Sequence, residues 1–239
     1  MNSETTWPLA ILLDFYGTVV EEDGEPIGHV CDEIVRASSK ATTAKEVSSY
    51  WGRVFNQMCL GSYGSTFRRE RELEQASLQE VLLHFDADLD SEKLSQAVYD
   101  YWTRPAIFPE SRGVIANCGV PICLLSNIDN ADLASALKHN GLSFDLVVTS
   151  EDCKAYKPRP EPFEKALSLL GLSNEEVLHV GDSLSSDVRG ARALAIPVLW
   201  INRRKRKLPA GHERPDYVSA DLTRISDIVS KGYGTNSME

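Results

Sequence analysis

The sequence lacks the features that would place a protein in a membrane or outside the cell. Its 239 residues contain no apolar run that approaches the roughly 18 to 20 residues needed to span a bilayer. The N-terminal stretch MNSETTWPLAILLDF has no basic segment ahead of its apolar run, so we expect no signal peptide. The five cysteines form no C-x-x-C pair, and their odd number argues against a disulfide framework. These absences favour a protein of the reducing cytoplasm.

Positive charge is also scarce. Acidic residues outnumber basic residues by 35 to 25, which gives a formal net charge of −10 and a pI near 5.1. Such a surface would repel a nucleic acid duplex or an anionic membrane, so we expect neither as a partner. The basic run at 203–207 breaks this trend and is typical of a solvated loop. The sequence leaves both a monomer and a homodimer open.

The sequence does contain a series of short apolar segments without clean alternation of apolar and polar residues. They are residues 9–13, 121–125, 145–149, 177–180 and 197–201. This pattern is typical of strands that are buried on both faces. Helix-like segments lie between them, at 131–140, 160–170 and 187–194. The alternation predicts an α/β fold with a Rossmann-like parallel sheet and helices on both faces.

One long segment, residues 20–105, has helical periodicity and no strand signals. Four helices are predicted there, at 27–38, 44–60, 68–85 and 91–102. We therefore expect two domains, a core of residues 1–19 and 106–239 and an all-helical insert of residues 20–105. An insert placed directly after an acid-bearing strand can act as a lid.

Polar residues stand just after the predicted strands, where ligands bind to a parallel sheet. In chain order they are Asp14, Ser126, Asn127, Lys157, Asp182 and Asp187. Any one of them is more typical of a turn or a helix cap, but the set would meet at one sheet edge. Carboxylates gathered in a cleft are costly unless a cation joins them, and an oxygen-only set favours Mg²⁺. The sequence therefore predicts a magnesium site, with Lys157 as a further positive charge for an anionic small-molecule substrate.

Four segments resemble the motifs of the haloacid dehalogenase superfamily of hydrolases, in the same order. They are DFYGTV at 14–19, LLSN at 124–127, Lys157-Pro158, and GDSLSSD at 181–187. The resemblance covers the chain from about residue 9 to 231. It implies that residues 1–19 and 106–239 form the family's catalytic core and that the insert at 20–105 is its helical cap.

The resemblance further implies a covalent mechanism, in which Asp14 forms an aspartyl intermediate that water hydrolyses. In metal-dependent members, the corresponding ligands of Mg²⁺ would be Asp14, the backbone carbonyl of Tyr16, and Asp182, with Asp187 as a ligand or a neighbour. The catalytic residues implied in this way are Asp14, Tyr16, Thr18, Ser126 and Lys157. The expected substrate-binding residues are Gly17, Ser126, Asn127 and Lys157.

Tyr16 separates two interpretations. Phosphatases of this superfamily carry a second aspartate at this position to protonate the leaving alcohol, whereas tyrosine, with a pKa of about 10, is a weak donor at neutral pH. A halide leaves without a proton, and the 2-haloacid dehalogenases carry Asp-x-Tyr-Gly-Thr here. Those enzymes are metal-free and have Ser where this chain has Asp182. Their substrate-binding arginine directly follows a cap tryptophan, but Trp51 is followed by Gly52 and only then by Arg53.

We give the metal site more weight than the tyrosine, because Asp182 without a cation would be a costly anion beside Asp14. The sequence thus predicts a Mg²⁺-dependent phosphatase of small phosphorylated metabolites. A metal-independent 2-haloacid dehalogenase is the alternative. A phosphonatase-like hydrolase, which would need a cap lysine, and a catalytically silent member that binds a ligand are the remaining alternatives.

Overall fold

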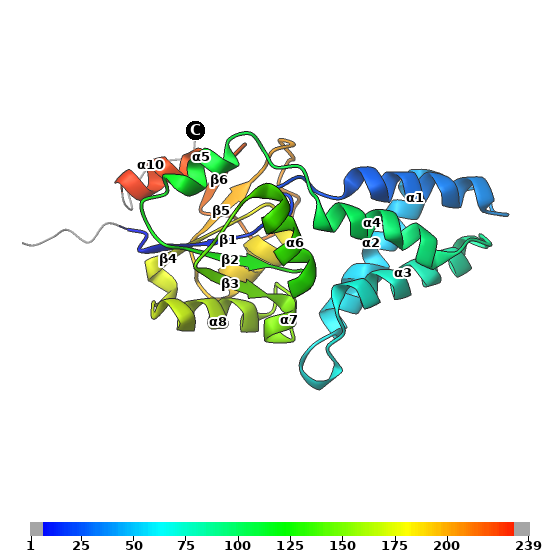
Figure 1. Ribbon diagram of the computed structural model, residues 1–239, viewed down its shortest axis with the longest axis horizontal. Helices are drawn as coiled ribbons and strands as arrows, with labels where there is room; N and C mark the ends of the chain where they lie inside the picture. Colours follow the sequence, from blue (N-terminus) through cyan, green and yellow to red (C-terminus); the bar gives the residue numbers. More distant parts are fainter. Residues whose placement is uncertain (1–6, 232–239) are drawn as a thin grey trace, which may run out of the picture.

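A six-stranded parallel sheet lies beside a helical unit in the computed structural model, which describes residues 7–231 (Figure 1). The strand order is β3-β2-β1-β4-β5-β6, and all neighbouring strands pair in parallel. This arrangement confirms the predicted α/β fold. The strands are β1 (Ala10–Leu13), β2 (Ile122–Ser126), β3 (Leu146–Thr149), β4 (Val177–Gly181), β5 (Val198–Ile201) and β6 (Tyr217–Ser219).

The last strand, β6, is absent from the sequence-based prediction. It is a short edge strand of three residues, Tyr217–Ser219, and Val218 at its centre is 46% exposed. An edge strand pairs on one side only and needs no continuous apolar run, so its sequence carries a weak signal. The five predicted segments all form strands close to their predicted positions, including β3 at the other edge of the sheet.

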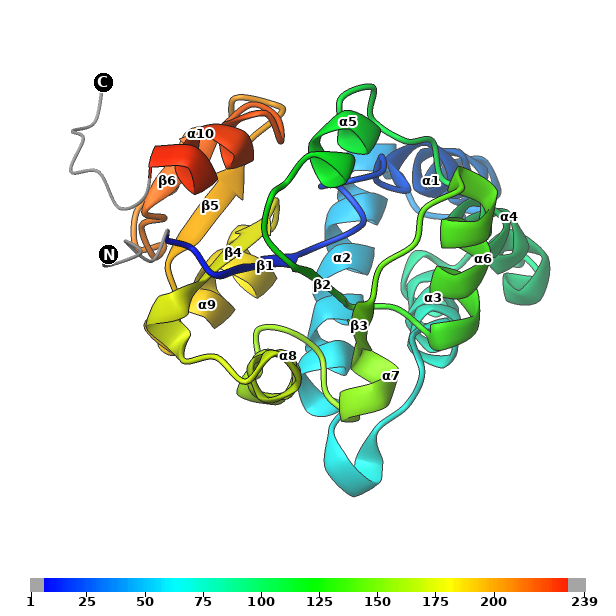
Figure 2. The ribbon, with the colours of Figure 1, turned by 60° about the vertical axis from the view of Figure 1, so that its left-hand side comes forward.

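The sheet is buried on both faces because successive side chains of a strand point to opposite sides. Ile11 and Leu13 of β1 belong to the apolar cluster that contains α5 (Ser111–Ala116), α6 (Asn130–Asn140) and α10 (Arg224–Lys231). Ala10 and Leu12 belong to the cluster on the other face, with α8 (Pro160–Leu170) and α9 (Arg189–Ala193). Figure 2 shows these two helical layers on either side of β1. A three-layer core therefore carries the strand ends.

The helical unit consists of α1 (Gly24–Ala37), α2 (Ala44–Gly61), α3 (Glu70–Phe85) and α4 (Ser91–Thr103), with a short 3₁₀ turn, η1 (Gly64–Thr66). All four α-helices lie close to their predicted positions. The start of α2 is set by a capping box, in which the Thr43 hydroxyl accepts from the Glu46 N–H and the Glu46 carboxylate accepts from the Thr43 N–H. Val47, Leu78, Val81 and Val98 pack in the interior of the unit.

The two segments that connect the helical unit to the sheet lie side by side. Val20 and Ile107 form an antiparallel bridge, and the Glu21 N–H donates to the Ala106 carbonyl at 2.8 Å. The helical unit therefore leaves and rejoins the core at one place, beyond the carboxyl end of β1 (Figure 1).

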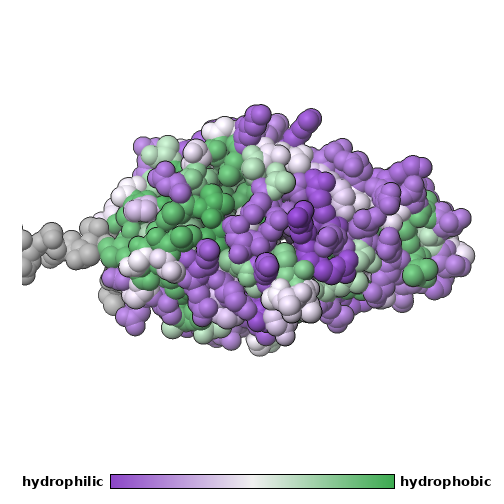
Figure 3. Space-filling view, turned by 60° about the horizontal axis from the view of Figure 1, so that its bottom comes forward, coloured by the Kyte–Doolittle hydropathy of each residue, from purple (hydrophilic) through white to green (hydrophobic). Residues whose placement is uncertain are grey.

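Hydrophilic side chains cover much of the face shown in Figure 3, while apolar side chains gather towards the sheet-bearing end at the left. Within residues 7–231, no helix has the length and apolarity to cross a membrane.

Glu74 of α3 provides a test of the packing inside the helical unit. Its side chain is 2% exposed, and burial raises the pKa of Glu74 to about 7. A folded-state pKa above the unfolded value means that the native state binds more protons, so stability falls as pH rises from about 4.5 to 7.

We expect Glu74→Gln to become more stabilising as pH increases, because glutamine does not ionise. Its advantage over the wild type in the free energy of unfolding should grow by about 2 kcal/mol between pH 5 and pH 8. Urea unfolding of both proteins at the two pH values measures this difference. Glu80→Gln, on the exposed side of the same helix, is the control, and an advantage of Glu74→Gln that is equal at both pH values would contradict the expectation.

Candidate active site

A buried lysine, Lys157, contacts residues at or just beyond the carboxyl ends of three strands, β1, β2 and β4. Lys157 is 4% exposed, and its Nζ donates to Asp14 Oδ1 at 2.7 Å, to Asp187 Oδ1 at 2.7 Å and to the Leu125 carbonyl at 2.8 Å. The other oxygen of Asp14, Oδ2, accepts a hydrogen bond from the Thr18 hydroxyl at 2.8 Å. The structure thus brings together the predicted nucleophile, the predicted lysine and an acid of the fourth motif.

In this network, the positive charge of Lys157 and the negative charges of the acids favour each other's ionised forms. Burial disfavours the ammonium ion, but Asp14 and Asp187 outweigh it and hold the pKa of Lys157 above its usual range. Burial also disfavours ionised Asp187, yet Lys157 and His179 hold the pKa of that carboxyl well below its usual range. Burial raises the pKa of Asp14 in spite of Lys157. Asp14 and Asp187 therefore share one strong cation.

Asp182 has no equivalent cation. Its side chain is largely buried directly after β4, and its nearest basic group is Arg206, whose Nη2 lies 3.5 Å from Oδ2. Burial, with repulsion from Asp14 and Asp187, raises the pKa of Asp182 to about 9. One oxygen from each of these three acids lies within 4.8 Å of the other two. This set of hard oxygen donors fits a divalent cation such as Mg²⁺.

Two glycines make room for these carboxylates. Gly17 has φ +80°, and a Cβ there would lie 2.7 Å from the carboxylate carbon of Asp182. At Gly181, a Cβ would lie 2.3 Å from the carboxylate carbon of Asp187. Only glycine allows the first and fourth motifs to approach this closely.

A small cavity of about 130 Å³ opens onto the nucleophile. Its walls are Asp14, Tyr16, Ser126, Asn127, Lys157, Asp182, Ser183, Ser186 and Asp187. Ser126 ends β2 and is buried there, and its contact with a bound anion stays a prediction. The Asn127 amide is bonded to the backbone of Lys157, at 3.0 Å and 2.7 Å. Asn127 therefore positions the lysine, and direct contact of its side chain with a substrate stays a prediction.

His179 is a member of the site for which the sequence offers almost no signal. It is fully buried in β4, and its Nε2 lies 3.0 Å from Asp187 Oδ1. The two-residue spacing from Gly181 is the only hint, because it puts both residues on the same face of the strand. The second oxygen of Asp187 accepts from the Ser183 N–H at 3.0 Å. Every oxygen of Asp187 thus has a partner, which holds the carboxylate in place.

The helix predicted at 187–194 begins differently. Leu184–Val188 form a π-helical turn, η3, and α9 follows it. The Ser183 hydroxyl accepts from the Ser186 N–H at 3.2 Å, and the Asp187 carboxylate turns back to the Ser183 N–H. This local bonding replaces the regular first turn that the sequence predicts.

Tyr16 connects the core to the helical unit. Its hydroxyl donates to the Trp102 carbonyl of α4 at 2.5 Å. Burial raises the pKa of Tyr16 well above its usual range, and the carboxylates of Glu70, Asp132 and Asp23 raise it further. A hydroxyl that is committed to a carbonyl and resists ionisation cannot replace a catalytic aspartate.

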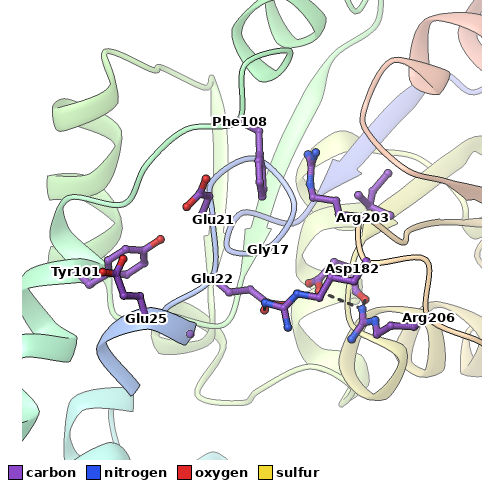
Figure 4. A pocket seen from close by; sticks show the side chains of 12 residues that line it. Gly17, Glu21, Glu22, Glu25, Tyr101, Phe108, Asp182, Arg203 and Arg206 are labelled. Atoms are coloured by element: carbon purple, nitrogen blue, oxygen red, sulfur yellow. Dashed lines mark hydrogen bonds and ion pairs between the residues drawn. The ribbon is translucent and has the colours of Figure 1, made fainter. Parts of the chain in front are cut away.

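A wider cavity of about 390 Å³ lies next to Asp182 (Figure 4). Arg203 and Arg206 line one side, and Glu21, Glu25 and Tyr101 line the other, with Gly17 between them. The prediction that the run at 203–207 is a solvated loop is wrong for its first residue. Arg203 donates to the Thr18 carbonyl at 2.7 Å and stacks on Phe108 at 3.5 Å from the ring centroid, contacts that only the tertiary fold creates.

The helical unit is bonded to the core at the rim of the site. The Arg71 guanidinium holds Asp132 of α6 through two hydrogen bonds, at 2.8 Å and 2.5 Å. Asp129 accepts from the backbone N–H of Glu70 at 2.8 Å and of Arg71 at 3.3 Å, at the start of α3. These charged contacts keep α3 against α6 beside the nucleophile.

Comparison with known proteins places this geometry in a family. A family model for haloacid dehalogenase-like hydrolases matches residues 8–194. The (S)-2-haloacid dehalogenase of Pseudomonas sp. (strain YL) is 25% identical over 230 residues, which cover 94% of this chain and 95% of that protein. The phosphoserine phosphatase of Thermus thermophilus is 31% identical over 216 residues, which cover 85% of this chain and 74% of that protein.

A solved structure agrees with the fold. The L-2-haloacid dehalogenase from Xanthobacter autotrophicus superposes with a TM-score of 0.73 at 19% identity, and the match covers 93% of this chain and 98% of that chain. The nearly full-length similarity to dehalogenases supports that alternative better than the phosphatase that the sequence favours. Both activities occur within one family. Because the family model covers most of the chain, this protein belongs to the haloacid dehalogenase-like hydrolases.

Proposed function

We propose that this hydrolase releases phosphate from small phosphorylated metabolites, with Asp14 as nucleophile and Mg²⁺ as cofactor. The proposal is carried by the position of Asp182, whose carboxylate lies within 4.8 Å of Asp14 and Asp187. Lys157 donates hydrogen bonds to Asp14 and Asp187 and makes no such bond with Asp182. Arg206, at 3.5 Å, is the one basic side chain paired with Asp182 among the described residues, and a divalent cation would neutralise all three carboxylates at once.

Asp14, Asp182 and the carbonyl of Tyr16 would hold the ion, with Asp187 beside them. When bound, Mg²⁺ neutralises the clustered carboxylates and polarises an oxygen of the phosphoryl group. Lys157 and the Thr18 hydroxyl orient the Asp14 carboxylate through the bonds described above. An oxygen of Asp14 attacks phosphorus, the bond from phosphorus to the leaving oxygen breaks, and water then hydrolyses the aspartyl phosphate.

We further propose that α1–α4 act as a cap over this reaction. Two adjacent connecting segments attach the unit, and the contacts of Asp129 and Asp132 with α3 hold it against the core. The cavity beside the nucleophile, at about 130 Å³, is large enough for a phosphoryl group and small enough to leave the rest of a substrate to the helical unit.

A metal-independent 2-haloacid dehalogenase is the second candidate. It is favoured by Tyr16 within DFYGT and by the similarity to dehalogenases over nearly the whole chain. The site has no arginine where those enzymes bind the substrate carboxylate. Gly52 follows Trp51, and Arg53 lies over the ring of Tyr50, 5.6 Å from its centroid, on the side of a separate surface pocket.

The two candidates differ in their dependence on Asp182. We expect phosphate release from a panel of metabolite phosphates in Mg²⁺, its loss in a chelator, and a decrease of about 10³-fold or more in Asp14→Asn and Asp182→Ser. Phosphate and halide are measured separately, with 2-chloropropionate as the dehalogenase substrate. Chelator-resistant halide release that survives in Asp182→Ser would overturn the proposal and establish the second candidate.

Tyr16 predicts a preference for leaving groups that need no proton. Tyr16→Phe should keep the rate on 4-nitrophenyl phosphate within about threefold, because the hydroxyl is bonded to Trp102 and takes no part in proton transfer. Tyr16→Asp should raise the rate on alkyl phosphates by about 10²-fold, because it adds the missing general acid. Steady-state kinetics with both substrate types test this, and a large loss in Tyr16→Phe on 4-nitrophenyl phosphate would show that the hydroxyl is catalytic.

A further inference from the structure

The helical unit contains a second cavity, of about 230 Å³, which the proposed chemistry does not use. We call it the cap cavity. Residues from all four helices of the unit contribute to it, together with Asp23 just before α1. Its principal walls are Asp23, Ile27, Trp51, Phe55, Glu74 and Trp102. Three of these six side chains are aromatic and two are acids.

One of the acids has a free buried oxygen. Glu74 is 2% exposed; its Oε2 accepts from the Ser95 hydroxyl at 3.0 Å, while its Oε1 has no hydrogen-bond partner. Asp23 is the second acid, and its Oδ2 accepts from the indole N–H of Trp102 at 2.8 Å. A buried carboxylate oxygen without a donor is costly, so the Glu74 carboxylate lacks a positively charged or N–H-bearing partner.

The protein supplies no such partner to the cap cavity. No basic side chain is found among the described residues that line it. The nearby guanidinium of Arg71 is held in its two bonds to Asp132 and lies over the ring of Tyr99, 4.5 Å from the centroid. Glu70, one turn before Glu74, adds another buried acid, and its Oε2 also has no partner. The acids of this region therefore have no cationic partner among the described residues that line the cap cavity.

We propose that the cap cavity binds a small organic ammonium group. Its N–H would donate to Glu74 Oε1, Asp23 would supply a second negative charge, and the rings of Trp51, Phe55 and Trp102 would face the cation. A carboxylate ligand would instead meet two acids, which sets this cavity apart from one that receives a haloacid. Gly52 on α2 also lines the cavity, so no side chain fills the position after Trp51.

A hydrogen bond connects the walls of the cap cavity and of the small cavity at Asp14. Trp102 lines the cap cavity, and its carbonyl accepts from the hydroxyl of Tyr16, a residue that lines the small cavity at Asp14. This hydrogen bond thus joins the wall of the small cavity, where a phosphoryl group would bind, to the wall of the cap cavity, where an ammonium group would bind. Resting on the proposed function, this arrangement identifies the substrate class as phosphate esters of small amino alcohols.

Binding is tested directly with ethanolamine, whose ammonium group has a neutral counterpart in propan-1-ol. Trp51 and Trp102 line the cavity, so titration of tryptophan fluorescence reports on it without substrate or metal. We expect saturable binding of ethanolamine that is at least tenfold tighter than that of propan-1-ol. Glu74→Gln should weaken ethanolamine binding at least tenfold, while Glu80→Gln should leave it unchanged.

Equal binding of the two probes, no binding of ethanolamine, or full affinity in Glu74→Gln would each overturn the inference. Urea unfolding of Glu74→Gln checks that the variant is folded. Failure of this binding test is distinct from failure of the proposed function, because the titration requires no catalysis.

The substrate class is tested by comparing kcat/KM for phosphoethanolamine and for propyl phosphate. A preference of at least tenfold for phosphoethanolamine that disappears in Glu74→Gln supports the substrate class, and equal values refute it.

Discussion

The structure of the site depends on the ammonium group of Lys157. It is buried at the sheet edge and bonded to Asp14, to Asp187 and to the Leu125 carbonyl, so one charge joins segments that lie far apart in the chain. A buried cation with this many partners is stable only if all of them are in place. His179 and the Ser183 N–H hold Asp187 from behind, and Asn127 holds the backbone of Lys157. Asp14 is positioned by this whole set rather than by any one contact.

The core and the helical unit differ in the chemical groups that they present. The core presents lysine, hydroxyl and backbone donors to an anion, and the helical unit presents buried acids and aromatic rings. Tyr16 lies at the boundary: it lines the small cavity, and its hydroxyl donates to the Trp102 carbonyl. Tyr16 therefore serves as a structural link between the two parts. Its role explains how a poor proton donor can occupy a position next to the nucleophile.

Overall similarity and local chemistry point in different directions within this family. The chain matches dehalogenases over nearly its whole length, and the fold agrees with theirs. Asp182, however, adds a carboxylate beside Asp14, Gly52 leaves the cap cavity without a side chain at its position, and two positions contribute almost nothing to overall identity. Folds are conserved through their cores, whereas activity depends on a few side chains at the strand ends and in the cap. The relatives therefore show the family and the fold, and the reaction is decided by the assays of phosphate and halide release proposed above.

The sequence by itself determined the inner strands, the four helices of the insert and the grouping of Asp14, Lys157, Asp182 and Asp187. These follow from local periodicity and from the rule that parallel strands end at one edge. Only the tertiary structure revealed the contact of His179 with Asp187, the position of Arg203, the edge strand β6 and the free oxygen of Glu74 in the cap cavity. These features depend on contacts between elements of the fold, which local sequence periodicity does not encode. Whether a buried polar atom has a partner is likewise decided by the packing of several elements at once.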